Sequence, residues 1–141
     1  MEKRKILLLD DDINKYDLTV AYLEIVKNYT VEKVRTFESA LSAYNKTKDE
    51  LCVILLDVML PMESILSETE RQNSNKGLNT GIVFAERINN EGNTVPIILL
   101  TARKDNDVES FVGQFHIKEI LRKPIFIDDL TNKIESVCIN D

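Results

Sequence analysis

Several polar side chains of this 141-residue chain stand directly after short apolar runs, and their types suit phosphoryl chemistry. Carboxylate oxygens bind divalent cations such as Mg²⁺, which prefers hard oxygen ligands. A lysine amine and a threonine hydroxyl can both donate hydrogen bonds to phosphoryl oxygens. The residues concerned are Asp10-Asp11-Asp12 after the run 6–9, Asp57 after 53–56, Thr101 after 95–100, and Lys123 shortly after Ile120-Leu121.

These residues need elements that bring them together, and the hydrophobic pattern predicts such elements. Each apolar run is too short for a helix, and the segments between the runs carry apolar residues every three or four positions. Alternating strands and helices predict an α/β fold with a parallel sheet covered on both faces, whose strand ends converge on one ligand-binding crevice. The predicted strands are 5–9, 31–35, 52–56, 95–100 and 117–121; the predicted helices are 13–28 with Asp12 as its N-cap, 37–47, 81–90, 105–114 and 127–139.

Length and composition restrict the classes of protein to which the chain could belong. One domain spanning residues 1–141 is the expectation, because 141 residues suffice for a single core. The net charge of −6 lacks the basic character that phosphate contacts with nucleic acid require. No apolar stretch approaches the length of a membrane span, and the apolar run after the basic N-terminus ends within four residues. We therefore expect a cytoplasmic protein without direct nucleic-acid or membrane contact.

Cysteine and histidine offer little catalytic potential in this chain. Cys52 and Cys138 lie in apolar segments without metal-ligand spacing, which favours two buried, reduced thiols. His116 is the only histidine, so any triad would have one candidate base. Its place just before a predicted strand favours a surface or loop role.

The motifs at the four strand ends resemble those of the receiver domain of two-component response regulators. The resemblance covers essentially the whole chain. It implies a flavodoxin-like fold, a doubly wound five-stranded parallel sheet in the order 2-1-3-4-5 with five helices. The matching pieces are Ile6-Leu7-Leu8-Leu9-Asp10-Asp11, Ile54-Leu55-Leu56-Asp57-Val58-Met59-Leu60-Pro61, Ile98-Leu99-Leu100-Thr101-Ala102 and Leu121-Arg122-Lys123-Pro124.

The resemblance also assigns roles to the acidic residues. Asp57 matches the phospho-accepting aspartate, whose carboxylate forms an acyl phosphate. Asp10 and Asp11 match the acidic pair that holds Mg²⁺, with Asp11 as a direct ligand and Asp10 acting mainly through water. Asp57 itself and the backbone carbonyl of Met59 would complete the protein ligands. A cation is needed because a phosphoryl group cannot otherwise approach three carboxylates.

Other matched residues would respond to the phosphoryl group. Lys123 matches the lysine that pairs with a phosphoryl oxygen, and Thr101 matches the switch hydroxyl. Ala102 is small where the family needs room beside the phosphoryl group. Pro124 is expected to keep a cis peptide bond, as its family counterpart does.

The chain departs from the family pattern in three places. Ile120 stands where the family usually has a switch aromatic, and His116-Ile117 replaces the usual Gly-Ala before the last strand. Gly81 follows Pro61 by 20 positions rather than about four, an excess of about sixteen residues. We therefore expect an inserted loop at 62–80, which is either a tolerated surface loop or a lid or docking element held by Ile65 and Leu66.

Two further side chains are predicted to tune the lifetime of the acyl phosphate. Met59 lies two residues after Asp57, and Arg103 lies two residues after Thr101. In the family these positions flank the path of the attacking water. Neither side chain offers an obvious base, which predicts slow self-dephosphorylation.

The leading hypothesis is a single-domain response regulator rather than an enzyme with a separate substrate. A histidine kinase or phosphotransfer protein would dock around Asn14–Leu18 and after Lys123, and an unknown protein would read the output. A second hypothesis is a haloacid-dehalogenase-type phosphatase with Asp10 as nucleophile and Asp128-Asp129 as its late acidic pair. A third is a receiver-like adaptor that works without phosphorylation.

Overall fold

The computed structural model describes residues 3–61, 66–75, 77 and 79–138. Its five parallel strands follow the order β2-β1-β3-β4-β5, which confirms the predicted fold class and strand order. Strands β1, β3 and β4 are almost wholly buried, as expected where helices cover both faces of a sheet. The strands are β1 (Lys5–Leu9), β2 (Thr30–Val34), β3 (Leu51–Asp57), β4 (Ile97–Thr101) and β5 (Ile117–Arg122).

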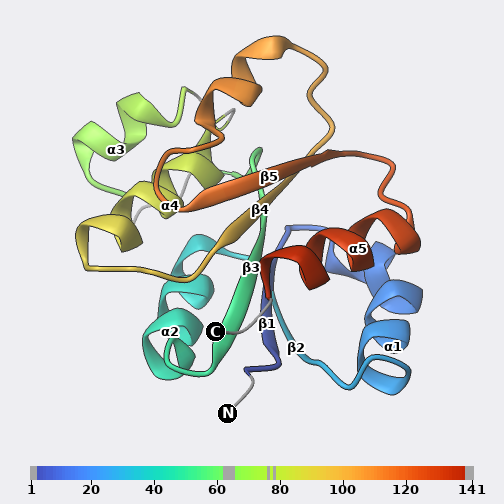
Figure 1. The fold of residues 1–141 in the computed structure, drawn as a ribbon. Coiled ribbons are helices and arrows are strands. Elements are labelled where there is room, and N and C mark those ends of the chain that lie inside the picture. The colour runs from blue at the N-terminus through green and yellow to red at the C-terminus, as the bar shows by residue number, and fades with distance from the viewer. Residues whose placement is uncertain (1–2, 62–65, 76, 78, 139–141) are drawn as a thin grey trace.

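Helices lie in two layers on either side of this sheet (Figure 1). Helices α1 and α5 cover one face, and α2 and α4 cover the other, with α3 outside α4. The helical segments are η1 (Ile13–Tyr16), α1 (Asp17–Ile25), α2 (Phe37–Thr47), α3 (Glu68–Asn73), α4 (Thr80–Asn90), η2 (Asn106–Phe111) and α5 (Ile127–Val137), of which η1 and η2 are 3₁₀ helices.

The core is divided by the sheet because successive strand residues point to opposite faces. In β1, Leu7 and Leu9 join the cluster with α2 and α4, whereas Ile6 and Leu8 join the cluster with α1 and α5. All four side chains are essentially inaccessible to solvent. This double burial fixes the strand register, and with it the positions of the residues at the strand ends.

The first helical segment differs from the prediction over 13–28. It starts as the 3₁₀ helix η1, and α1 ends at Ile25, so that Val26 is exposed rather than part of the buried face. Asp12 is the N-cap residue of η1, as predicted for the start of this segment, but its side chain makes no capping hydrogen bond. The backbone N–H of Asp12 instead donates to the carboxylate of Asp10.

The loop predicted at 62–80 contains the short helix α3. Ser67 and Glu70 form a capping box at its start, in which each side chain accepts a hydrogen bond from the other's backbone N–H. Leu66 is buried, as its predicted anchoring role requires, whereas Ile65 lies outside the described residues.

The prediction of a fourth helix over 105–114 is wrong in both helix type and length. It forms the 3₁₀ helix η2, and Val108 is its buried residue. A single buried side chain provides too little apolar contact to hold a longer α-helix. The other predicted strand and helix boundaries agree with the structure to within two residues.

Candidate functional site

Three carboxylates converge at the carboxyl end of the sheet. Asp57 is the last residue of β3, and Asp10 and Asp11 directly follow β1. Ligand oxygens of the three side chains all lie within 4.8 Å of one another. Asp10 and Asp57 are buried, and Asp11 is exposed, so the group is open to solvent on one side.

The carboxylate of Asp10 is held by several donors. Its Oδ1 accepts from the Asp12 backbone N–H at 2.9 Å. Its Oδ2 accepts from the Tyr16 hydroxyl at 2.8 Å and from Lys123 Nζ at 2.9 Å, with Lys15 Nζ at 3.5 Å. Burial alone would raise the pKa of Asp10, but these contacts outweigh it and lower the pKa below its ordinary value.

Asp57 has weaker partners, although it is nearly as buried. Its Oδ1 accepts from the Met59 backbone N–H at 3.3 Å and lies 3.5 Å from Lys123 Nζ. Burial, followed by the nearby negative charge of Asp10, raises the pKa of Asp57 to about 6.

Lys123 is the cation that joins these two carboxylates. It immediately follows β5, where its backbone N–H donates to the Thr101 carbonyl at 2.7 Å. The predicted cis peptide bond to Pro124 is present. Burial opposes the charged amine, but contacts with its neighbours, including Asp10 and Asp57, raise the pKa of Lys123. The amine therefore stays charged between the acids.

Thr101 and its neighbours occupy the next strand. Thr101 ends β4 and is fully buried, and its Oγ1 accepts from the Arg103 backbone N–H at 3.0 Å. Ala102 is exposed. Ile120, at the position of the usual switch aromatic, is half-buried and packs against the core beneath α2 and α4.

Arg103 links the site to Asn79 in segment 62–80. Its guanidinium donates to Asn79 Oδ1 at 2.6 Å and to the carboxylate of Asp105 at 2.9 and 2.7 Å. The pair with Asp105 raises the pKa of Arg103. Met59, the other predicted tuning residue, has 39% of its surface exposed.

The described part of segment 62–80 contacts the rest of the protein at several points. Arg87 of α4 donates from Nε to Glu70 Oε2 at 2.7 Å, and a second bond joins the same two side chains. The Arg87 guanidinium also lies 4.9 Å from the ring centroid of Phe37. The Leu60 backbone N–H donates to the Gly77 carbonyl at 3.3 Å. The described part of the segment therefore packs beside α4.

Gly81 brings α4 directly against the end of β3. Its N–H donates to the Val58 carbonyl at 2.9 Å, and a Cβ there would lie 2.1 Å from the Asp57 carbonyl oxygen. Any side chain at this position would force the helix away from the strand. Glycine is thus required for the close approach beside Asp57.

Sequence reasoning missed three contributors to the site, namely Tyr16, Lys15 and Asn79. The spacing of Tyr16 in the first predicted helix favours a place on the apolar face, and the Tyr16 ring does pack in the core. The signal that could have identified it is its hydroxyl, because a buried phenol requires a polar partner. Lys15 and Asn79 carried no comparable signal in the sequence.

The oxygen donors fit the predicted Mg²⁺ in kind and number. Mg²⁺ is bound in proteins through one or two carboxylates, and it keeps several waters. The exposed Asp11 leaves room for those waters, and Asp57 places an acceptor beside them. Asp128 and Asp129, by contrast, are exposed in the first turn of α5 and take no part in the acidic group. This arrangement gives the phosphatase hypothesis no support.

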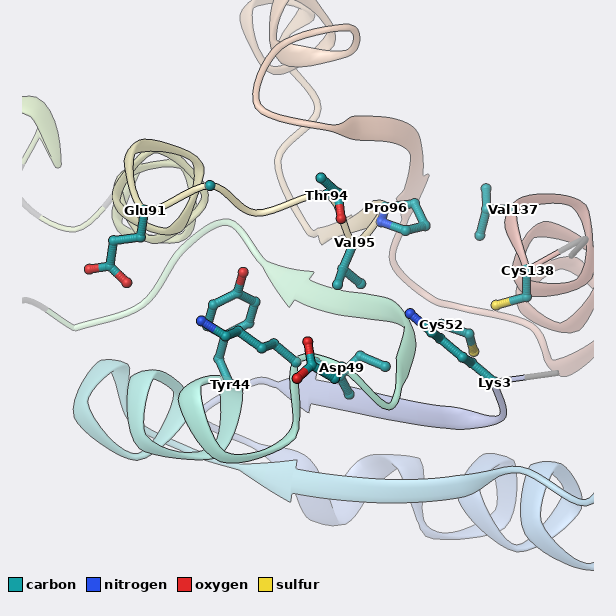
Figure 2. A pocket seen from close by; sticks show the side chains of 13 residues that line it. Lys3, Tyr44, Asp49, Cys52, Glu91, Thr94, Val95, Pro96, Val137 and Cys138 are labelled. Carbon is teal, nitrogen blue, oxygen red and sulfur yellow. The ribbon is translucent and has the colours of Figure 1, made fainter. Parts of the chain in front are cut away.

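A cavity of about 450 Å³ lies at the amino ends of the strands (Figure 2). Residues that precede β1 and β4, or end α2 and α5, line it, and both Cys52 and Cys138 face it. Cys52 is buried and Cys138 is half-buried. The cavity is at the opposite end of the sheet from Asp57, where ligands of open α/β sheets do not ordinarily bind.

Among the described residues, no helix is both long and apolar enough to cross a lipid bilayer.

Comparison with known proteins gives consistent results over nearly the whole chain. The family model described as response regulator receiver domain matches residues 6–135. Among curated relatives, the transcriptional regulatory protein RprY of Bacteroides fragilis is 30% identical over 138 residues, covering 96% of this chain and 50% of that protein. Regulatory protein VanR of Enterococcus faecium is 34% identical over 109 residues, 77% of this chain and 38% of VanR. The chain thus spans half or less of the length of these relatives.

Solved structures agree in fold. The signal receiver domain of a putative Luxo repressor protein from Vibrio parahaemolyticus has a TM-score of 0.76 at 22% identity, covering 96% of this chain and 90% of that one. The non-phosphorylated HemR receiver domain from Leptospira biflexa also has a TM-score of 0.76, at 23% identity, covering 99% and 97%.

Proposed function

This chain belongs to the response regulator receiver family, and from that premise we propose that Asp57 accepts a phosphoryl group and that a partner protein reads the resulting change. The observation that carries the proposal is the convergence of Asp10, Asp11 and Asp57, with the amine of Lys123 against Asp10 and Asp57. A nucleophile, a cation-binding acidic pair and a positive charge are what phosphoryl transfer to a carboxylate requires.

The residues divide the work as follows. A carboxylate oxygen of Asp57 attacks phosphorus, and Lys123 pairs with a phosphoryl oxygen. Asp10, Asp11, Asp57 and the Met59 carbonyl would hold Mg²⁺, and the cation, when bound, supplies the positive charge that lets a phosphoryl donor approach. Thr101 Oγ1, which now accepts from the Arg103 N–H, is the hydroxyl placed to turn toward the phosphoryl group.

We infer that the donor is a phosphohistidine of a histidine kinase or phosphotransfer protein. The phosphorus–nitrogen bond breaks as the phosphorus–oxygen bond to Asp57 forms, and the imidazole takes up a proton. A cavity of about 260 Å³ lined partly by Lys15, Lys123 and Pro124 lies beside the site. Leu18, on the solvent side of α1, is 80% exposed and offers the donor protein an apolar contact.

The proposal also covers how this chain relates to its longer relatives. The relatives named as transcriptional regulators are about twice as long, and this chain aligns with about half of each. We propose that residues 1–141 form one phosphoryl-accepting unit with an insertion at 62–80. Direct nucleic-acid contact by this unit is disfavoured by its net charge of −6.

Intact-mass spectrometry after incubation with Mg²⁺ and acetyl phosphate tests the proposal. A gain of one phosphoryl group that needs Mg²⁺ and is lost in Asp57→Ala is the expected result. If acetyl phosphate and a panel of phosphorylated histidine kinases all leave the mass unchanged, the adaptor hypothesis replaces this one.

A further inference from the structure

Tyr16 makes a contact that the proposed roles do not explain. Its side chain is 4% exposed, and its hydroxyl donates to Asp10 Oδ2 at 2.8 Å. The 3₁₀ helix η1 ends at Tyr16, and the Tyr16 side chain turns back toward Asp10, six residues earlier and directly after β1. The ring packs with Val20 and Leu23 of α1, so the hydroxyl is presented from a fixed position.

Lys123 cannot be the sole fixed partner of Asp10 in a working site. Its amine lies 2.9 Å from Asp10 and 3.5 Å from Asp57, so it contacts both acids at once. Pairing with a phosphoryl group on Asp57 would draw the amine away from Asp10. Lys15, the other cation, is 3.5 Å away and has a side chain that is 38% exposed, so it constrains Asp10 weakly.

We propose that Tyr16 is a positioning residue for the cation site, holding the Asp10 carboxylate oriented when Lys123 turns to the phosphoryl group. This inference rests on the proposed function. A ligand or a water-mediated ligand that is already oriented loses less freedom on binding a metal, and outer hydrogen-bond partners of this kind typically contribute about 10- to 100-fold in metal affinity. The phenol suits the task because it is a neutral donor with a rigid ring.

Binding of Mn²⁺, followed by the electron paramagnetic resonance signal of the free ion, measures this role without any phosphoryl transfer. Tyr16→Phe keeps the ring and removes only the hydroxyl. We expect its Mn²⁺ Kd to rise about tenfold. Tyr44→Phe is the matched control, because Tyr44 is buried and donates its hydroxyl to Asn93 Oδ1, also at 2.8 Å, at the other end of the molecule. The Mn²⁺ Kd of Tyr44→Phe should equal that of the wild type, even if its melting temperature falls as much as that of Tyr16→Phe.

A double-mutant cycle separates positioning from packing. In an Asp10→Asn background, Tyr16→Phe should change the Mn²⁺ Kd less than twofold, because the charge to be oriented is gone. A full effect in that background would overturn the inference, since the hydroxyl would then act through packing. If Tyr16→Phe does not fold, Tyr16→Met fills similar apolar volume without a hydroxyl and carries the same expectation.

The remaining outcomes distinguish this inference from the proposed function. Wild-type Mn²⁺ binding that is lost in Asp11→Asn but unchanged in folded Tyr16→Phe would overturn the role of Tyr16 and leave the function intact. An absence of Mn²⁺ binding by the wild type would overturn both.

Discussion

Asp10 and Asp57 are buried in the same site, but their pKa values are shifted in opposite directions: the pKa of Asp10 is lowered and that of Asp57 is raised. Asp10 has the closer contact with Lys123 and the donors from Tyr16 and Asp12, which stabilise its negative charge. Asp57 has a long bond from the Met59 N–H and a more distant amine. Asp57, the proposed nucleophile, is therefore the less stabilised carboxylate, and its negative charge destabilises the folded state.

The raised pKa of Asp57 makes stability depend on pH. Its pKa is about 6 when folded and 3.8 when unfolded, so its contribution is fully present below pH 3.8 and is lost as pH rises through about 6. Asp57→Asn, which stays neutral, should be more stable than the wild type by about 1–3 kcal/mol at pH 7.5 without metal, and equal to it below pH 4. Urea unfolding at the two pH values checks this.

The control for this titration is Asp49→Asn, at an exposed acid far from the site. It should show no comparable pH-dependent gain. If the wild type is more stable than Asp57→Asn at pH 7.5, the ionised Asp57 carboxylate stabilises the folded state, and the prediction is wrong.

We also expect single side chains to set the lifetime of the proposed acyl phosphate. Met59 has no proton-accepting group, and Arg103 is bonded to Asn79 and Asp105, so neither can activate water. The double variant Met59→Asn/Arg103→Glu should dephosphorylate severalfold faster than the wild type. The decay of the phosphorylated mass after removal of acetyl phosphate measures both rates, and a faster wild type would contradict the prediction.

At residue scale, the sequence identified the side chains that lie at strand ends and not those that approach from elsewhere. Asp10, Asp11, Asp57 and Lys123 could be predicted because the topology of the sheet brings strand ends together. The contact of Arg103 with Asn79 joins residues 24 positions apart through an insertion, and no periodic pattern encodes such a contact.

At the scale of elements, the described part of segment 62–80 contains a helix that contacts α4. Helix α3 starts with a capping box at Ser67, and Glu70 joins it to Arg87 of α4. The capping pattern was visible in the sequence as Ser67 and Glu70 with two residues between them. It was missed because α3 has no buried residues of its own, and hydrophobic periodicity detects only helices that bury a face.

The Glu70–Arg87 pair should stabilise the protein moderately and in a pH-dependent way. The hydrogen bond from Arg87 lowers the pKa of Glu70, so the contribution is present above about pH 4.5 and is lost as pH falls below it. Glu70→Gln should lower the unfolding free energy by about 0.5–1 kcal/mol at pH 7, since both side chains are about four-fifths buried. Equal stability of Glu70→Gln and the exposed control Glu68→Gln in urea would contradict the docking role.

Strands and the long helices were predictable, whereas the 3₁₀ segments were not. Buried apolar runs set the strands, and the helices with a clear buried face, such as Phe37–Thr47, were located correctly. Segment 105–114 has one buried apolar residue in η2, and the start of the first helix is shaped by the bonds of Asp10. Tertiary contacts, rather than local propensity, determine both segments.

At the scale of the whole molecule, the site concentrates negative charge in a protein that is already acidic. The net charge is −6, and three carboxylates share one group at the sheet's carboxyl end. Folding and cation binding should therefore be coupled, because the folded state alone assembles the site.

Magnesium should raise the thermal stability of the whole protein. At a concentration of about 100 times its Kd, a ligand that binds only the folded state adds about 2.7 kcal/mol, which corresponds to several degrees in Tm. The rise should disappear with EDTA and in Asp11→Asn, and NaCl at equal ionic strength should not reproduce it. A similar rise in Asp11→Asn would indicate general charge screening instead of a specific site.

The most direct test of the central claim locates the phosphoryl group. Reduction of the phosphorylated protein with borohydride converts an acyl-phosphorylated aspartate to homoserine, and peptide mass mapping then identifies the position. The account predicts homoserine at Asp57 and an unmodified Asp10. Modification at Asp10 with Asp57 unchanged would contradict it and would favour a phosphatase-type nucleophile.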